Sequence, residues 1–196
     1  EEGATVEYST DGGTSWSEEA PTAQQGDNAI LVRQTDAAGN TSDSGELNYT
    51  LDSTAPNAPS ATLADGDGFI TTDEIDGSNQ VAVTVGLANT NAAAGDTLTV
   101  NGTDTVLTQA QIESGEVSIS VAAPNEGENL AVTATVTDAA GNPSGEGRAE
   151  AQRDTTAPDA PTLTLDNDSG SSDSDGVTRD GSYSVGNVEE GATVEY

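Results

Sequence analysis

Two short motifs occur twice in this chain, and their spacing decides how it is divided. T-D-A-A-G-N stands at 35–40 and at 137–142, and D-[ST]-T-A-P-[ND]-A-P stands at 52–59 and at 154–161. The separations, 137 less 35 and 154 less 52, are both 102 residues, so the distance between the two motifs is kept. Repeats of this length with proline-rich segments between them predict a row of similar domains rather than one globule.

A third repeat sets a longer period. E-E-G-A-T-V-E-Y forms residues 1–8 and again 189–196, a separation of 188 residues, so a unit of 102 residues alternates with a unit of 86 (188 less 102). The chain then consists of the later strands of a shorter unit at 1–55, a complete longer unit at 56–157 and the first strands of the next shorter unit at 158–196. We expect the two end segments to complement each other, between neighbouring molecules or along a continuous array of which this chain is a part.

Alternation of apolar and polar residues predicts antiparallel β-sandwiches. In 56–157, short alternating segments with turn residues between them recur roughly every ten residues, which is typical of a sandwich of about seven strands. The fold class expected is therefore all-β, with tandem sandwiches joined end to end by short proline-containing linkers. The expected strands are 60–64, 80–88, 96–102, 116–123, 130–138 and 146–154, with a helix-like segment at 105–115 after Thr108, and, in the end segments, 5–10, 28–36, 46–52, 161–166, 182–188 and 193–196.

The linkers are predicted to be stiff. Two prolines three residues apart in T-A-P-N-A-P (54–59) fix their own backbone and bias the residues before them towards extended conformations. A flexible hinge would contain glycine and serine instead. Trp16, the single tryptophan, is expected to be a core residue rather than part of a binding site.

Composition excludes several classes of function. The chain has 35 acidic residues against 4 basic ones, a net charge of −31, which disfavours binding to nucleic acid and to anionic membranes. It contains no histidine and no cysteine, which excludes Cys–His and Ser–His–Asp catalysis, the common zinc sites and disulfides. No apolar run approaches the ~20 residues of a membrane span. We expect neither an enzyme nor a membrane-inserted segment.

Many of the acidic residues lie in glycine-rich loops, where oxygen ligands for a hard cation are found. Asp65, Asp67 and Gly68 in one loop match Asp173, Asp175 and Gly176 in the other, and each glycine is followed by an apolar residue expected to anchor the loop. Alternate aspartates on a tight turn bring carboxylates to one side, and Ca²⁺ prefers such ligands. An EF-hand is disfavoured because no flanking helices are predicted, while a solvated Asp–Gly turn without metal stays open.

The expected topology gathers these acids at the domain joints. The turn T-D-A-A-G-N lies between the last two strands of each unit, at the end where the chain enters, whereas the acidic loop lies at the exit end. The alternative for this turn is an aspartate hydrogen-bonded to its own backbone. The candidate calcium ligands are Asp154 with Asp65, Asp67, Asp73 and Glu74, facing a residue of the Asp36 type, and Asp52 with Asp166, Asp168, Asp173, Asp175 or Asp180, facing Asp138.

Together these motifs resemble the bacterial Ig-like extender repeats of giant RTX-type biofilm adhesins secreted by type I systems. The resemblance covers nearly the whole chain and rests on V-E-Y-S-T-D-G-G-T-S-W (6–16), V-R-Q-T-D-A-A-G-N-T-S (32–42), the linkers and the acidic loops. It implies Ig-like domains, Ca²⁺ near the joints and a place on the bacterial cell surface. The partners implied are neighbouring repeats, with the adhesion target bound by other domains. Ser53 and Asn57 depart from the Thr and Asp of the second linker.

Three classes of function follow from this reading. The favoured one is a calcium-stabilised structural spacer. A glycan- or surface-binding Ig-like module is the alternative, although six aromatic residues, mostly on core-facing positions, disfavour an aromatic platform. An enzyme that uses paired carboxylates is the least favoured, because the acids lie on turns without a cleft.

Overall fold

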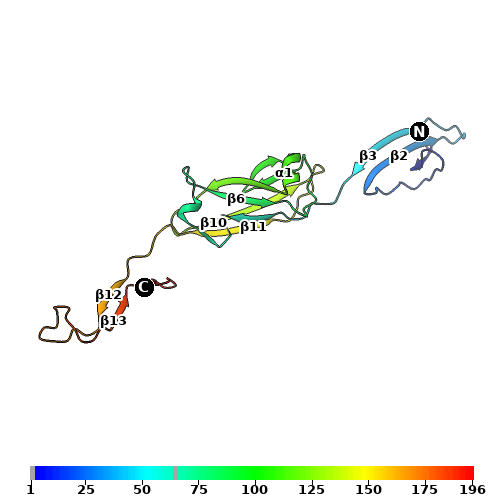
Figure 1. Ribbon diagram of the computed structural model, residues 1–196. Helices are drawn as coiled ribbons and strands as arrows, with labels where there is room; N and C mark the ends of the chain where they lie inside the picture. The colour runs from blue at the N-terminus through cyan, green and yellow to red at the C-terminus, as the bar shows by residue number, and fades with distance from the viewer. Residues whose placement is uncertain (1–2, 64–65) are drawn as a thin grey trace.

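The computed structural model describes residues 3–63 and 66–196. It contains three bodies in a row: a small sheet that holds the N-terminal strands, a central β-sandwich and a small C-terminal sheet (Figure 1). The described residues are almost entirely β or irregular, with one short α-helix and one 3-10 turn. The all-β antiparallel class expected from the alternation is confirmed. No described helix is long and apolar enough to cross a membrane.

The N-terminal sheet is antiparallel and has the strand order β1-β2-β3. Its strands are β1 (Thr5–Ser9), β2 (Gly26–Thr35) and β3 (Gly45–Leu51). The T-D-A-A-G-N turn connects β2 to β3, as predicted. Trp16 packs beside Gly13 and Leu31, and the Arg33 guanidinium stands 4.0 Å from the centre of its ring. The segment after β1 therefore covers the face of the sheet that carries Leu31 and Arg33.

The central domain packs a three-stranded sheet against a five-stranded one. The first has the order β4-β6-β9 and the second the order β5-β11-β10-β7-β8, in which only β5 runs parallel to its neighbour. The strands of the first are β4 (Ser60–Leu63), β6 (Gln80–Gly86) and β9 (Glu116–Ala122); those of the second are β5 (Phe69–Ile70), β7 (Thr97–Val100), β8 (Thr103–Val106), β10 (Asn129–Thr137) and β11 (Gly147–Arg153).

The core of the central domain consists of the inward residues of both sheets. Val81, Val83 and Val85 alternate along β6 and are fully buried, while Val132 and Val136 do the same on β10. This alternation with period two is what closes the sandwich, because every second side chain of a strand points to the same face. The core contains no large aromatic residue, which agrees with the single Phe of the chain, Phe69, being 48% exposed.

The helix-like segment is a short α-helix, α1 (Gln109–Ser114). The Thr108 side chain accepts from the Gln111 N–H, and Gln111 Oε1 accepts from the Thr108 N–H (2.9 Å), which completes a capping box. Gly115 ends the helix with a left-handed backbone, φ 75°. A second short element, the 3-10 turn η1 (Thr72–Glu74), lies in the acidic loop and was not predicted.

The C-terminal sheet is a two-stranded antiparallel pair, β12 (Thr162–Leu165) and β13 (Tyr183–Gly186). The strand expected at 193–196 is absent, although the same four residues form part of β1 at 5–8. A strand needs a hydrogen-bonding neighbour, and β1 has β2 whereas 193–196 pairs with no described strand. The prediction for 193–196 was therefore wrong in this chain.

The 102-residue period extends to the strands themselves. β3 and β11 cover 45–51 and 147–153, and β4 and β12 cover 60–63 and 162–165, each pair offset by 102. The first hairpin is repeated with a connection two residues shorter, since Ser60 pairs with Gly86 in β4–β6 whereas Thr162, 102 residues on, pairs with Gly186, 100 residues on, in β12–β13. The two end sheets thus have the geometry of parts of the central domain.

Candidate metal loops and domain joints

The two T-D-A-A-G-N turns have the same internal hydrogen bonds. Asp36 Oδ1 accepts from the backbone N–H of Ala38 (2.9 Å) and Asn40 (2.8 Å), and its Oδ2 accepts from the Asn40 side chain (2.8 Å). Asp138 makes the corresponding bonds to Ala140 and Asn142 at 2.9, 2.8 and 2.9 Å. These bonds, led by that from the asparagine side chain, lower the pKa of both aspartates. The carboxylates hold their own turns in shape.

The second turn also reaches the entry linker of the central domain. Asn142 Nδ2 donates to the Asp52 carbonyl oxygen (3.1 Å) as well as to Asp138. The Asp52 carboxylate is itself bound by Gln25 Nε2 (2.8 Å) and by the Thr54 N–H (3.0 Å). Asp52 and Asp138 therefore lie on the two sides of one joint, and Asn142 links them by hydrogen bonds.

The linker that follows is anchored to the central domain. Pro56 and Pro59 are buried, and Asn57 donates through its backbone N–H to Thr90 (2.8 Å) and through its side chain to Asn89 (2.8 Å). Burial of both prolines leaves the linker little freedom beyond that already removed by their rings. The entry linker is therefore held against the central domain by both burial and hydrogen bonds.

The exit linker is held by Glu126, which sequence reasoning did not identify. Its carboxylate accepts from Thr155 N (2.8 Å), Thr155 Oγ1 (2.5 Å) and Thr156 Oγ1 (3.1 Å), and the Arg153 Nε lies 3.5 Å away. The Thr155 hydrogen bonds, followed by the weaker ones, lower the Glu126 pKa. Gln25, which binds Asp52 and Ser53, does the same at the entry linker. Gln25 and Glu126 both lie in the loop before the strand that leads to T-D-A-A-G-N. This shared position is the sequence feature that could have identified them.

The first acidic loop lies against the exit linker, as its position after β4 predicts. The Asp154 N–H donates to the Ile70 carbonyl oxygen (3.0 Å), and Asp154 Oδ1 accepts from Thr156 N (3.2 Å). Asp67 Oδ1 accepts from Phe69 N (2.7 Å), and Glu74 Oε2 caps η1 through Thr71. Asp73 is exposed, and Asp65 lies outside the described residues.

The second acidic loop repeats the Asp–Gly turn and adds a buried carboxylate oxygen. Asp175 Oδ1 accepts from Val177 N (3.0 Å), as Asp67 does from Phe69. Asp168 Oδ2 accepts from Gly176 N (2.9 Å), whereas Asp168 Oδ1 is buried and has no hydrogen-bond partner. The Ser182 side chain donates a hydrogen bond to Asp180 Oδ1, and this bond is the main reason why the pKa of Asp180 is lowered. Asp166 binds Ser184 at the base of the loop, and Asp173 is exposed.

The apolar residue after the glycine does not anchor either loop. Phe69 is 48% and Val177 68% exposed, whereas Ile70, one residue further, is fully buried. The reason lies in β5, which pairs in parallel with β11 and points alternate residues to opposite faces, so that the second residue enters the core.

The chemistry of the second loop fits a cation. A buried carboxylate oxygen without a donor is costly, and a cation would relieve that cost. Ca²⁺ takes carboxylate and carbonyl oxygens, which is what this loop offers. Across residues 3–63 and 66–196, however, no three acidic side chains lie close enough together to form a metal-binding group. The metal ligands therefore stay predictions.

No protein-family model matches the chain, and no curated protein matches it in sequence. Among solved structures, the chain is similar to a Ca2+-stabilised adhesin with which an Antarctic bacterium binds ice, with 25% sequence identity over 83% of this chain and a TM-score of 0.44. A second similar structure is that of a 1.5-MDa bacterial ice-binding adhesin, with 20% identity over 83% of this chain and a TM-score of 0.38. A third is that of the fibronectin(III)-like modules of Clostridium thermocellum CbhA, with 14% identity over 77% of this chain and a TM-score of 0.38. The alignments span 43%, 57% and 80% of those chains.

Proposed function

We propose that this chain is a calcium-stabilised structural extender of a large bacterial cell-surface adhesin. It holds the ligand-binding domains of the same protein at a distance from the cell and takes no part in binding the target or in catalysis. The observation that carries the proposal is the repetition of strands, turns and linkers at a fixed offset of 102 residues, because a repeated unit adds length without adding a new site.

The contacts of the two linkers with the central domain support this function. At the entry side, Pro56 and Pro59 are buried and Asn142 connects the central domain to Asp52. At the exit side, Glu126 binds Thr155 and Thr156. Each linker is thus held by hydrogen bonds to side chains of the central domain, and such contacts would help a spacer to keep its extended length.

Calcium would act on the large negative charge of the chain. A net charge of −31 opposes compaction through self-repulsion, and divalent cations on the acidic loops reduce it. The residues proposed to hold Ca²⁺ are Asp168, Asp175 and Asp180 in the second loop, with Asp166 and Asp173 nearby. In the first loop they are Asp67, Asp73, Glu74 and Asp154 with Asp65, and at the turns Asp36, Asp52 and Asp138.

The calcium affinity expected of such sites determines where they are filled. Extracellular calcium modules bind at about 10⁻⁴ to 10⁻³ M, so such sites are empty in the cytosol and filled outside. A ligand that binds only the folded form stabilises it by mass action. The chain would therefore be weakly stable before export, for which a type I system is proposed, and stable at the cell surface.

Calorimetric titration of calcium into the chain tests the proposal. The expected result is saturable binding, which Asp168→Asn weakens because it removes the charge of the buried oxygen. Asp104→Asn is the matched control, since Asp104 lies on β8 and binds Thr99 rather than a loop. Equal titrations for the parent chain and Asp168→Asn would refute the role of Asp168, and no binding by the parent would refute the calcium proposal.

A further inference from the structure

We propose that the free edge of β9 in the central domain is a self-association surface, at which two copies of this chain join their three-stranded sheets edge to edge. The two β9 strands pair antiparallel over residues 117–121, with Ile119 at the centre. The contact belongs to the complete central domain, goes beyond the proposed spacer function and does not depend on calcium.

Strand β9 (Glu116–Ala122) has a neighbouring strand on one side only. In the order β4-β6-β9 it is an outer strand, and it pairs antiparallel with β6 along its whole length. Just beyond its two ends, Leu87 N–H donates to the Gly115 carbonyl oxygen (2.7 Å) and Ala123 N–H donates to the Asn79 carbonyl oxygen (3.0 Å). These two bonds fix which residues of β9 bond to β6.

The backbone groups of Ser118 and Ser120 point away from β6. Hydrogen-bonded residues alternate along an antiparallel ladder, so residues 117, 119 and 121 direct their N–H and C=O groups towards β6 and the residues between them direct theirs to the free side. Both serines are exposed, and within the described parts of the chain no hydrogen bond reaches these edge groups. The edge of β9 is therefore open to a further strand.

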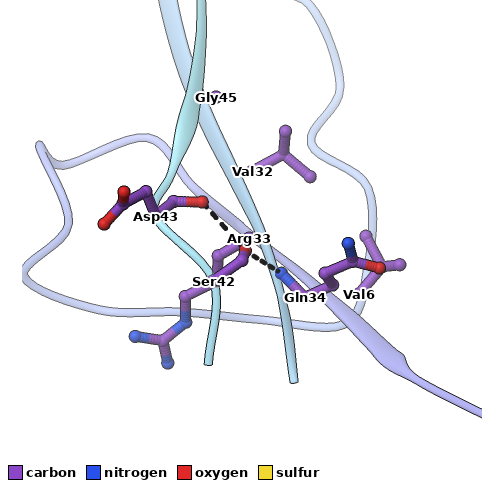
Figure 2. A pocket seen from close by; sticks show the side chains of 7 residues that line it. All are labelled: Val6, Val32, Arg33, Gln34, Ser42, Asp43 and Gly45. Carbon is purple, nitrogen blue, oxygen red and sulfur yellow. Dashed lines mark hydrogen bonds between the residues drawn. The ribbon is translucent and has the colours of Figure 1, made fainter. Parts of the chain in front are cut away.

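Elsewhere the chain satisfies such backbone groups with a serine side chain. Figure 2 shows this after the first T-D-A-A-G-N turn, where Ser42 Oγ accepts from the Gln34 N–H (3.1 Å). At the start of β9, Ser114 Oγ donates to the Glu116 carbonyl oxygen (2.9 Å) and accepts from the Glu116 N–H (3.4 Å). This cover ends at Glu116, so the middle of β9 is left open.

The other outer strands of the central domain are short, charged or covered, which are the usual ways in which an edge avoids pairing. β5 has two residues, β8 has four with Asp104 among them, and β4 begins directly after Pro59 and lies against β11. By contrast, V-S-I-S-V (117–121) contains no charge, proline or glycine, and its valines and isoleucine favour strands. The β9 edge is the one that the sequence leaves unprotected.

The sequence of β9 indicates that a second copy covers this edge. V-S-I-S-V reads the same in both directions about Ile119. An antiparallel neighbour with the same sequence therefore places Ser118 opposite Ser120 of the second copy, and Ile119 opposite itself. The two serines are the residues whose backbone groups point outwards, so both serine pairs occupy hydrogen-bonded positions. A strand of identical sequence is thus complementary in register as well as in backbone bonding.

The same register suits the side chains. Ile119 and Val121 point into the sandwich but are only partly buried, whereas Val117 is 4% exposed. In the pair, Ile119 of one copy packs against Ile119 of the other at a non-hydrogen-bonded position, where opposite side chains lie closest. Glu116 falls opposite Ala122 rather than opposite a second acid, which avoids a repulsive pair.

The contact is closed and weak. A twofold axis at Ile119 makes it isologous, so it ends at two copies, and the two chains run in opposite directions. Pairing over residues 117–121 buries less surface than the ~1,200 Å² of a stable interface. We therefore expect association at high protein concentration, and at an ionic strength that screens the net charge of −31.

Disulfide trapping tests the contact and its register together. The chain contains no cysteine, so a disulfide can form only between introduced residues. Ser118→Cys faces Ser120→Cys of a second copy at a Cα separation of about 5.5 Å, which suits a disulfide, whereas two copies of the same variant meet only on the diagonal, at about 7–8 Å. Under mild oxidation, we expect an equimolar mixture to form disulfide dimers several-fold faster than either variant alone.

A proline at the edge measures the association without a crosslink. Ser118→Pro removes no bond to β6, because the Ser118 N–H points outwards, but it blocks the second copy. Val106→Pro on β8 is the matched control: Leu107 N–H bonds to the Asp96 carbonyl oxygen (2.8 Å), so the Val106 N–H also points to a free edge. In sedimentation velocity up to about 1 mM, where weak contacts are populated, the parent and Val106→Pro should sediment faster as concentration rises, and Ser118→Pro should lose this dependence.

Three results would overturn the proposal. The first is a mixture of the two cysteine variants that forms dimers no faster than either variant alone. The second is a parent chain that stays monomeric at every concentration, and the third is a Ser118→Pro chain that associates as strongly as the parent. Circular dichroism checks the fold of each variant, and if Ser118→Pro does not fold, the disulfide experiment decides.

Discussion

Substitution of Gly147 by alanine tests the packing of the central domain at its tightest point. An added Cβ would lie 2.1 Å from the Pro59 carbonyl oxygen and 2.9 Å from its carbonyl carbon. Carbon and oxygen atoms do not approach much closer than about 3 Å without repulsion, so β4 and β11 would have to separate by roughly 1 Å. The atoms that must move belong to the backbone, which cannot rotate away as a side chain can.

The magnitude follows from what overpacking costs. Forcing an extra methyl group into a packed core typically costs about 1–3 kcal/mol. For a domain of about 100 residues, 1 kcal/mol corresponds to roughly 4–8 °C in Tm, so we expect Gly147→Ala to lower the Tm of the central domain by about 4–24 °C. The movement of β4 would also open the core around Leu63, which is 2% exposed.

Differential scanning calorimetry of the full chain measures this shift. Gly77→Ala is the control, because a Cβ there meets nothing within 4 Å and the backbone does not have a positive φ. It is expected to melt at the temperature of the parent chain. If Gly147→Ala melted at the same temperature as Gly77→Ala, the close approach of β4 to β11 would be wrong.

Three further predictions concern the joints and turns. Glu126→Gln weakens the bonds to Thr155 and Thr156, so nitrogen-15 relaxation should show faster motion of the exit linker; unchanged relaxation would contradict its role as a clamp. Asp138→Asn should lower the thermal stability at neutral pH, and the deficit should vanish as the pH falls through the lowered pKa of Asp138, because a carboxylate with a depressed pKa stabilises the fold only while ionised; a deficit that is constant with pH would refute this. Arg33→Met should destabilise the N-terminal sheet, because it removes the cation–π contact with Trp16, worth about 0.5–1 kcal/mol, together with the ion pair to Glu7 (3.0 Å), and it should shift tryptophan fluorescence; an unchanged spectrum would contradict the contact with Trp16.

Much of the fold could be predicted from the sequence because its signals are local. Alternation of apolar residues located β6 and β10, and the 102-residue offset placed the turn between β2 and β3 and between β10 and β11. Two short strands were missed, for different reasons. β5 has two residues and exists because it pairs with β11, and β8 is an exposed edge strand whose Val106 is 63% exposed.

Two contacts at the joints were predictable from the sequence, whereas the metal ligands stay predictions. The sequence indicated that the acidic loops and the T-D-A-A-G-N turns lie near the linkers, and Asp154 does meet the loop through Ile70, as Asp138 meets Asp52 through Asn142. It did not indicate that Asn142, Gln25 and Glu126 would make the contacts. Side-chain hydrogen bonds to a linker depend on the path of the backbone, which no short motif encodes.

The most direct test of the spacer function is small-angle X-ray scattering of the chain in calcium and in EGTA. Stiff joints predict a narrow distribution of distances with a large maximum dimension in calcium, and a broader, shorter distribution in EGTA that calcium restores. A scattering profile that is flexible in calcium, or identical in calcium and EGTA, would contradict the proposal that this chain is a calcium-stabilised extender.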